Sequence, residues 1–249
     1  MLRKLLSPRW ILIHIGVAAL IILMFNLGLW QLNRLDQKKS FNAVLRAHTS
    51  TPIQALDDAV PSKWNQAESE WIRVSITGSY DPSKAVTIIN RSQDGSAGYD
   101  SAVPFTSLNK RTILVNRGFI PLAMKSPPVP TGQVEIVGYL RASLSRSALG
   151  PIDSTAIGNT EFQRFDVPLI STYVGGTVEP MFLQLITETP KPNSQWPAKV
   201  ALPALDEGPH LSYALQWFFF CLVALTAWVV VIRRKLSQVS ASVQEQTSA

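Results

Sequence analysis

The three histidines, His14, His48 and His210, are the side chains of this sequence best suited to ligating a metal. An imidazole binds iron, copper or zinc through one ring nitrogen, so a histidine-dependent cofactor site must use one of these three. The single cysteine, Cys221, allows neither an intrachain disulfide nor a CxxC metal site. The sequence contains no G-x-S-x-G, phosphate-loop or H-E-x-x-H motif. These residues predict a protein that is not an enzyme.

His210 directly precedes a long apolar block in which aromatic residues recur. If the block is a helix, spacings of three, four, seven and eleven residues place on the same face Tyr213, Ala214, Trp217 and Cys221. An iron-ligating imidazole beside aromatic surface suits an amphiphilic ring such as haem. A polar residue that caps a helix or lies at the water boundary is the alternative interpretation of His210.

The other two histidines are weaker candidates for the same site. His14 lies a turn inside the first apolar block, and the helix rise places it roughly 20 Å or more from the height of His210. The two imidazoles therefore cannot ligate one iron within a simple pair of helices. His48 lies beside Thr49 and Ser50 in a polar stretch, and we expect it to be an exposed surface residue. A second axial ligand would have to come from a dimer or a partner protein.

Two apolar blocks must position these histidines, and each is long enough to cross a bilayer. Residues 11–30 and 211–232 contain no formally charged side chain, and a helix of about 20 residues covers the hydrocarbon core. The first block could also be a signal peptide, but its end, LGLWQLNR, is bulky where a cleavage site requires small residues. We predict two transmembrane helices, with Trp10, Trp30 and Trp217 towards the interfaces.

The charges around the second block predict the orientation. Asp206 and Glu207 precede it and three basic residues, 233–235, follow it, so both termini are expected in the cytoplasm. Much of the net charge of +6 flanks the blocks, which favours membrane lipid over nucleic acid as a partner. The predicted order is a cytoplasmic N-terminus (1–10), a transmembrane helix (11–30), a periplasmic or intermembrane-space domain (31–209), a second transmembrane helix (211–232) and a cytoplasmic tail (233–249), disordered from Ser237.

The segment between the blocks is predicted to be rich in β-structure. Residues 31–48 have helical spacing and should continue the first span, whereas residues 71–80 and 84–90 alternate and are predicted to form a hairpin. Further strands are predicted at residues 112–116, 133–140, 162–166 and 181–188, and loops at 125–132 and 190–203. The predicted fold class is two transmembrane α-helices flanking an extracytoplasmic α+β domain, a small antiparallel barrel-like fold.

Two further sets of polar residues require partners. Asn26 and Gln216 are costly in lipid, and we expect them to hydrogen-bond each other or a helix of another protein. Two Asn-Arg pairs occur at predicted strand ends, where a structural arginine in a turn is expected. The residues concerned are Asn90, Arg91, Asn116, Arg117 and Gly118.

Four segments resemble, in this order, the signature segments of the Surfeit locus protein 1 family: GLWQLNRLDQKK, INRSQDGSAGYDSAVPF, TILVNRGFIP and HLSYALQWFFF. The resemblance spans nearly the whole chain. It implies a two-span protein of the inner membrane whose domain faces the periplasm or the intermembrane space. It also implies an assembly factor for haem-copper cytochrome c oxidase rather than an enzyme.

The resemblance further implies a role for His210. Some bacterial members are thought to bind haem a and to present it to the large oxidase subunit, and the implied iron ligand is a histidine at the position of His210. The leading hypothesis is therefore an assembly factor that binds haem a through His210, with Tyr213 and Trp217 covering the ring. Its expected partners are oxidase subunits, chiefly the haem-bearing large subunit, and a homo-oligomer would supply a second histidine. The alternative is a scaffold that stabilises an oxidase intermediate without binding haem. A third class, a membrane-tethered enzyme, is disfavoured because the sequence offers no nucleophile–base pair.

Overall fold

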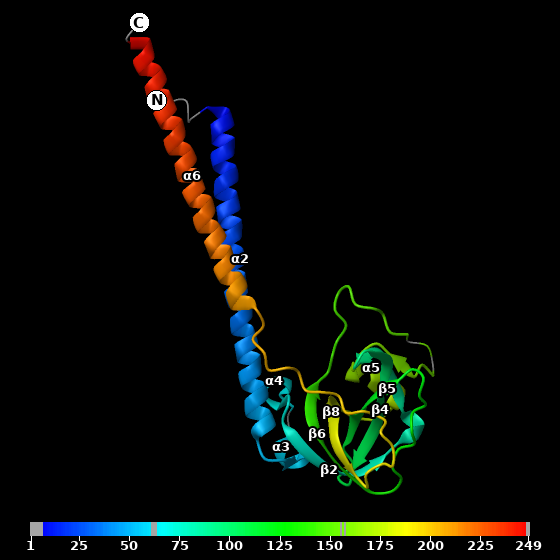
Figure 1. Cartoon of the computed structure of the whole chain (residues 1–249). Coiled ribbons are helices and arrows are strands. Elements are labelled where there is room, and N and C mark those ends of the chain that lie inside the picture. Colours follow the sequence, from blue (N-terminus) through cyan, green and yellow to red (C-terminus); the bar gives the residue numbers. More distant parts are fainter. Residues whose placement is uncertain (1–6, 61–63, 155, 157, 248–249) are drawn as a thin grey trace. The chain divides into compact units, whose positions relative to one another are not determined.

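The computed structural model describes residues 7–60, 64–154, 156 and 158–247 (Figure 1). Outside these ranges lie Arg3 and Lys4 of the expected N-terminal segment and Ser248 and Ala249 of the expected tail. The chain divides into two compact units, one formed by residues 1–44 and 204–249 and the other by residues 45–203. The two units are described separately below.

Two long helices, α2 (Pro8–Ser50) and α6 (His210–Thr247), dominate the first unit (Figure 1). Both are long and apolar enough to cross a membrane: α2 contains an 18-residue stretch with a mean hydropathy of 2.4, and α6 contains one with 2.3, which is compatible with a membrane protein. The helix expected at residues 31–48 is confirmed, because α2 continues unbroken through it. The expectation of disorder from Ser237 is wrong, since α6 continues to Thr247. That segment contains no glycine or proline that would end the helix.

The two helices pack in antiparallel directions along a seam with a seven-residue repeat. The less exposed seam positions of α2 are Trp10, His14, Val17, Ile21, Met24, Gly28, Gln31, Leu35, Lys38 and Asn42. Those of α6 are His210, Ala214, Trp217, Cys221, Ala224 and Trp228. This spacing is the a/d pattern of a coiled coil, and it keeps one face of each helix turned to the other. At Gly28 the helices are close, since a Cβ atom there would lie 2.6 Å from the ring of Phe218.

The second unit is built on one mixed sheet. Its described strands are β1 (Gln54–Ala55), β2 (Arg73–Tyr80), β3 (Val86–Gln93), β4 (Ser96–Ser107), β5 (Thr112–Pro121), β6 (Val134–Ala142), β7 (Glu161–Phe162) and β8 (Val178–Thr189). The strand order is β1-β2-β6-β8-β5-β4-β3-β7, and β2 also pairs with β4. The pairings of β2, β6, β8, β5 and β4 therefore return to β2 in a closed circuit. Shorter elements are α3 (Leu56–Ala59), α4 (Gln66–Ser69), a 3-10 helix (Pro82–Lys84) and α5 (Val167–Val174).

Several expectations about the domain are wrong. The strands at residues 71–80 and 84–90 form no hairpin, because β2 pairs with β1, β4 and β6 whereas β3 pairs with β4 and β7. The sheet is not purely antiparallel, since β8 lies parallel to β5. The strand expected at 162–166 is reduced to β7, and the chain then turns into α5. β4, with twelve residues, was not expected at all.

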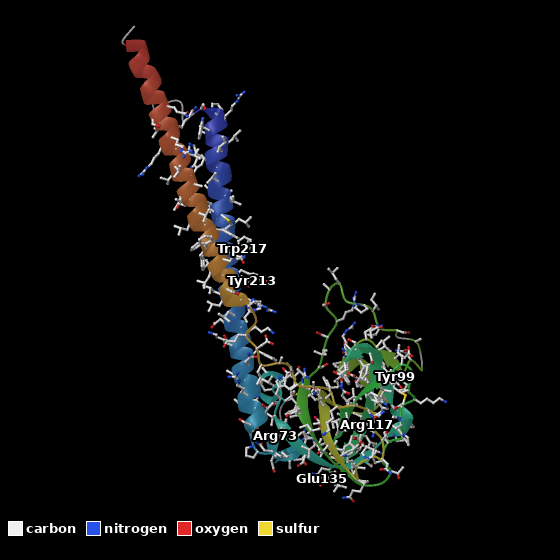
Figure 2. All side chains as sticks on the ribbon, viewed as in Figure 1. Arg73, Tyr99, Arg117, Glu135, Tyr213 and Trp217 are labelled. Atoms are coloured by element: carbon white, nitrogen blue, oxygen red, sulfur yellow. The ribbon has the colours of Figure 1, made fainter. Side chains whose placement is uncertain are left out.

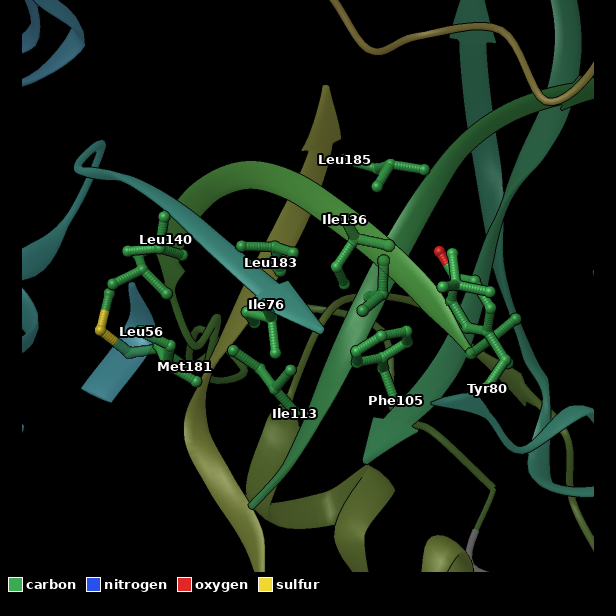
Figure 3. Close-up of a cluster of buried hydrophobic side chains, with 14 of the residues drawn as sticks. Leu56, Ile76, Tyr80, Phe105, Ile113, Ile136, Leu140, Met181, Leu183 and Leu185 are labelled. Carbon is green, nitrogen blue, oxygen red and sulfur yellow. The ribbon is translucent and has the colours of Figure 1, made fainter. Parts of the chain in front are cut away.

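Apolar side chains of the circuit strands form the larger core (Figure 3). Alternation along β5 divides its residues between two clusters: Ile113 and Val115 belong to this larger core, and Leu114 between them belongs to the other. The second cluster includes Ile170 of α5 and Phe182 of β8. The sheet therefore carries a core on each of its faces, and the short helix α5 covers one of them.

Candidate functional site

His210 is the first residue of α6, and its imidazole is held by the other long helix. His210 Nδ1 lies 2.8 Å from Oε1 of Gln31 on α2. An amide oxygen only accepts hydrogen bonds, so Nδ1 carries the proton and donates it. The second ring nitrogen, Nε2, makes no hydrogen bond within the described part of the chain. This arrangement is the one that metal-ligating histidines adopt, with one nitrogen oriented by a hydrogen bond and the other left to bind the metal.

Gly208, two residues before α6 begins, lies beside the Nε2 edge of His210. Gly208 has φ of +66°, and a Cβ atom at this position would lie 3.4 Å from both Cδ2 and Nε2 of His210. Tyr213 donates its backbone N–H to the carbonyl of Pro209, at 3.1 Å, which closes the first turn of the helix. The first turn therefore fixes the position of the imidazole along α6.

The two aromatic residues predicted beside His210 lie on the first turns of α6 (Figure 2). Tyr213 is 48% exposed, whereas Trp217 is half-buried on the seam and makes an edge contact with Phe220, with the ring centroids 6.1 Å apart. Tyr213 and Trp217 are four residues apart and so are neighbours on the helix surface. They supply aromatic surface within two turns of the imidazole.

His14 and His48 have environments of their own. The His14 ring meets the edge of Trp228, with the ring centroids 4.8 Å apart, near the other end of the helix pair. His14 lies 17 residues before Gln31 on α2, which corresponds to about 25 Å of helix rise and keeps it away from His210. The expectation that His48 is an exposed surface residue is wrong. His48 is half-buried, and its Nδ1 lies 2.6 Å from the carbonyl oxygen of Glu70.

Asn26 and Gln216 do not form the hydrogen bond considered for them. Asn26 Nδ2 donates to the carbonyl oxygen of Ile22 in its own helix, at 2.8 Å. Gln216 is exposed on α6. This intrahelical bond gives the Asn26 amide N–H an acceptor without a second helix.

The Asn-Arg pairs lie at irregularities inside strands rather than at strand ends. Asn90 has φ of +59° at the register shift between Ile88 and Arg91 of β3. Asn116 Oδ1 accepts the backbone N–H of Gly118, at 2.9 Å, where β5 is bulged against β4. The turn-like chemistry expected of both pairs is therefore used to shape β-bulges.

Arg117 is a buried structural arginine, as expected. Its side chain is 0% exposed, and Nη2 donates to Oε1 of Glu188 on β8, at 2.8 Å. The other carboxylate oxygen of Glu188 accepts the hydroxyl of Tyr80 on β2, at 2.9 Å. Burial, followed by the charge of Glu188, raises the pKa of Tyr80 and keeps its hydroxyl a donor. One carboxylate thus joins three strands of the circuit.

Comparison with known proteins places these residues in a family. The profile of the SURF1 family matches residues 18–222 of the chain. This match includes Gln31, Arg117, Glu188 and His210. The chain belongs to the SURF1 family. An uncharacterized SURF1-like protein of Mycobacterium tuberculosis is 29% identical over 88% of this chain and 82% of the relative.

Other SURF1 relatives come from distant organisms. A SURF1-like protein of Rickettsia felis is 26% identical over 86% of this chain and 94% of the relative. Surfeit locus protein 1 of Xenopus tropicalis is 25% identical over 92% of this chain and 77% of the relative. The SURF1 family match therefore covers the domain and reaches into both long helices.

Sequence reasoning missed two residues of this SURF1-family chain that position the candidates. The sequence predicts only that Gln31 lies in the helix after the first span. Its spacing of seven residues from both Met24 and Lys38 marks it as a seam position. Glu188 was the last residue of a predicted strand, and nothing in its local sequence points to Arg117. Both contacts join residues far apart in the chain, so local patterns carried little signal for them.

Proposed function

We propose that this SURF1-family chain is a non-enzymatic assembly factor for haem-copper cytochrome c oxidase that binds haem a through His210 and presents it to the large oxidase subunit. The observation that carries the proposal is the hydrogen bond from His210 to Gln31, which orients the imidazole and leaves Nε2 available. The proposal places both helices in the inner membrane, with the two termini in the cytoplasm and residues 31–209 in the periplasm.

The residues around His210 fit a haem held by one protein ligand. His210 offers a neutral imidazole with a free nitrogen, and no group of three or more histidine, cysteine, aspartate or glutamate side chains that could hold a metal occurs within the described ranges. A single imidazole would suit a haem, because the macrocycle itself supplies most of the ligands of the iron, better than it would suit a bare metal ion. A bound haem would supply a Lewis-acid iron for the imidazole to ligate.

The aromatic residues would have a separate role from the ligand. Tyr213 and Trp217 would pack against the macrocycle, and the exposure of Tyr213 leaves it accessible to a flat apolar ring. Gln31 would hold the imidazole at a fixed angle. His210 would thus hold the iron, while Gln31, Tyr213 and Trp217 would position the imidazole and the ring.

The decisive experiment compares His210→Ala with wild type in cells that make haem a. We expect the variant to reach the membrane at the normal level, because one alanine does not reduce the hydrophobicity of α6. We expect it to lose haem absorbance in the visible spectrum and to leave cells with less active oxidase. His14→Ala is the matched control, since it removes an imidazole from the opposite end of the helix pair and should leave the haem spectrum unchanged.

Two outcomes would overturn haem binding. If purified wild type carries no haem a, or if His210→Ala retains the full spectrum, the role of His210 fails and a scaffold that stabilises an oxidase intermediate takes its place. Normal oxidase in a strain that lacks the gene would instead reject the assembly role itself.

Reporter fusions test the proposed orientation. A reporter placed after Gln246 should be active only in the cytoplasm, because the basic residues 233–235 hold that end inside. A reporter within the loop at 125–132 should be active only in the periplasm. A periplasmic signal from the fusion after Gln246 would contradict the topology.

A further inference from the structure

A cavity of about 530 Å³ lies beside β8 in the second unit. One side is formed by Arg117 of β5 and by residues 185–189 of β8, and the other by the segment 191–199. Its volume is in the range of sites that bind small organic molecules. It lies within residues 45–203 and shares no residue with the candidate haem site.

The guanidinium of Arg117 has donors that nothing uses. Nη2 donates to Glu188, but Nε and Nη1 are buried and have no hydrogen-bond partner among the described residues. The ring of Tyr80 lies beside the group, 5.4 Å from Cζ to the centroid, and supplies no acceptor for these two donors. A buried charged donor without an acceptor is costly, so this guanidinium favours an anionic group that would complete its hydrogen bonds.

The residues that line the cavity give it an excess of positive charge. Among the described residues that line it, Glu188 is the only carboxylate, and its two oxygens already accept Nη2 of Arg117 and the hydroxyl of Tyr80. The Arg117–Glu188 pair is therefore neutral overall. Lys191 and Lys199 add two further positive charges to the lining. An anion in the cavity meets these two ammonium groups, and the unsaturated guanidinium of Arg117 is buried in the cavity wall.

The outer wall of the cavity is fixed to the sheet. Phe119 and Ala198 exchange two backbone hydrogen bonds, each 2.8 Å long. Gly118 allows this close approach, because a Cβ atom there would collide with the carbonyl oxygen of Ala198. Gln184 Nε2 adds a bond of 3.0 Å to the carbonyl oxygen of Val200. The segment that forms this wall is therefore anchored to the sheet, which lowers the entropic cost of binding.

We propose that this cavity binds a small organic oxyanion, a carboxylate or phosphate group carried on a short apolar body. The oxyanion completes the hydrogen bonds of Arg117 Nε and Nη1, and Lys191 and Lys199 attract it electrostatically. The apolar body packs against the lining formed by Leu185, Pro192, Pro197 and Ala198. The lining thus combines apolar residues with polar and charged ones, which suits a ligand that carries an anionic group on an apolar body.

The test uses the full chain in lipid nanodiscs, with arginine side chains labelled with ¹⁵N. Acetate, hexanoate, inorganic phosphate and hexyl phosphate are titrated separately, with sodium chloride holding the ionic strength constant. We expect saturable movement of the Arg117 Nε resonance, assigned by its loss in Arg117→Lys. We expect the hexyl compounds to bind more tightly than acetate and inorganic phosphate, and the tighter of the two series identifies the group as carboxylate or phosphate.

Charge variants separate a specific site from general ionic attraction. Lys199→Gln and Lys191→Gln should each weaken binding about threefold, the effect expected of one solvent-exposed charge. Lys125→Gln removes an exposed lysine that does not line the cavity, and it should leave the affinity unchanged. The proposal is overturned if the Arg117 resonance does not move, if chloride moves it equally, or if Lys125→Gln weakens binding as much as Lys199→Gln. If Arg117→Lys does not fold, the affinities of the lysine variants, measured by ligand-dependent thermal unfolding, decide the question.

Discussion

Gln31 and His210 stand 179 positions apart in the chain and share one hydrogen bond of 2.8 Å. The bond joins α2 to the first residue of α6 on the seam between the helices. The orientation of the candidate ligand is therefore set by the opposite helix rather than by its own. Any change that shifts α2 against α6 would also turn the imidazole.

Gln31→Leu should weaken haem binding about tenfold, the usual effect of removing the partner that orients a metal-ligating histidine. The imidazole then loses its acceptor and no longer presents Nε2 at one angle. Gln31→Glu keeps an acceptor and should retain most of the affinity. The measurement is a spectrophotometric haem titration of protein in detergent. Gln216→Leu makes the same change at an exposed site of α6, and an equal loss there would show that the amide of Gln31 has no orienting role.

Arg117→Ala should destabilise the domain by about 3–5 kcal/mol, because it leaves the buried Glu188 carboxylate without its cation. Thermal unfolding and the steady-state level of the protein measure this loss. Arg117→Ala combined with Glu188→Gln should recover part of it, since no buried charge then stays unpaired. Lys191→Ala removes an exposed charge nearby and should change stability by less than about 0.5 kcal/mol. Normal accumulation of Arg117→Ala with failed oxidase assembly would make Arg117 a contact site instead.

Gly118→Ala should cost more stability than Gly95→Ala, although both glycines have positive φ, +128° and +77°. At Gly95 a Cβ atom meets nothing within 4 Å, so the cost is the backbone strain alone, of order 1 kcal/mol. At Gly118 the added atom also collides with Ala198, which should break the two bonds between Phe119 and Ala198. Denaturant unfolding gives the two free energies, and hydrogen exchange of the Ala198 amide reports the local opening. Equal costs at the two sites would show that the contact with Ala198 is unimportant.

Asp100→Asn should stabilise the domain at neutral pH. Burial raises the pKa of Asp100 above 3.8, against the lowering effects of Arg91 and Asn116. A raised folded pKa means that the folded state binds the proton more tightly, so stability falls as pH rises from 3.8 through the folded value. The asparagine removes this penalty and can still bond Asn116. The melting temperature of the variant should therefore exceed that of wild type at pH 7, and the difference should shrink towards pH 4.

Asp57 supplies the opposite pH response as a control. Its hydrogen bond from Arg111 lowers its pKa, so its stabilising effect is present above pH 3.8 and is lost as pH falls below that value. Asp57→Asn should thus lower the melting temperature slightly at pH 7 and leave it unchanged in acid. If Asp100→Asn and Asp57→Asn shifted the melting temperature in the same direction at pH 7, the conclusion that folding raises the pKa of Asp100 would be wrong.

The sequence predicts the elements with strong local patterns. Uninterrupted apolar residues predict the two long helices, and alternation predicts β2 and β6 within two residues of their observed starts. β4 escaped prediction because Gly98 and Pro104 interrupt its alternation. α5 also escaped prediction, because its apolar and β-branched residues are equally compatible with a strand. The signal that could have identified it is Asp166, which caps the helix, followed by Pro168 in the first turn.

Pairing between distant segments could not be read from the sequence. β2 and β3 are neighbours in the chain, which favours a hairpin, but β2 finds its partners in β4 and β6. The same limit applies to the candidate sites. His210 and Arg117 were identified by residue type, whereas Gln31 and Glu188, which position them, are defined only by the tertiary structure.

The closed circuit of β2, β6, β8, β5 and β4 limits how a second protein can bind the domain. Backbone groups of those strands are occupied on both sides, and the terminal strands β1 and β7 have two residues each. The remaining edge, along β3, contains a register shift between Ile88 and Arg91, and such bulges discourage the docking of a foreign strand. Recognition by β-augmentation is therefore disfavoured, as is edge-to-edge aggregation. We expect a partner to read side chains and loops, so that its specificity is encoded in the surface residues of the domain and not in its backbone.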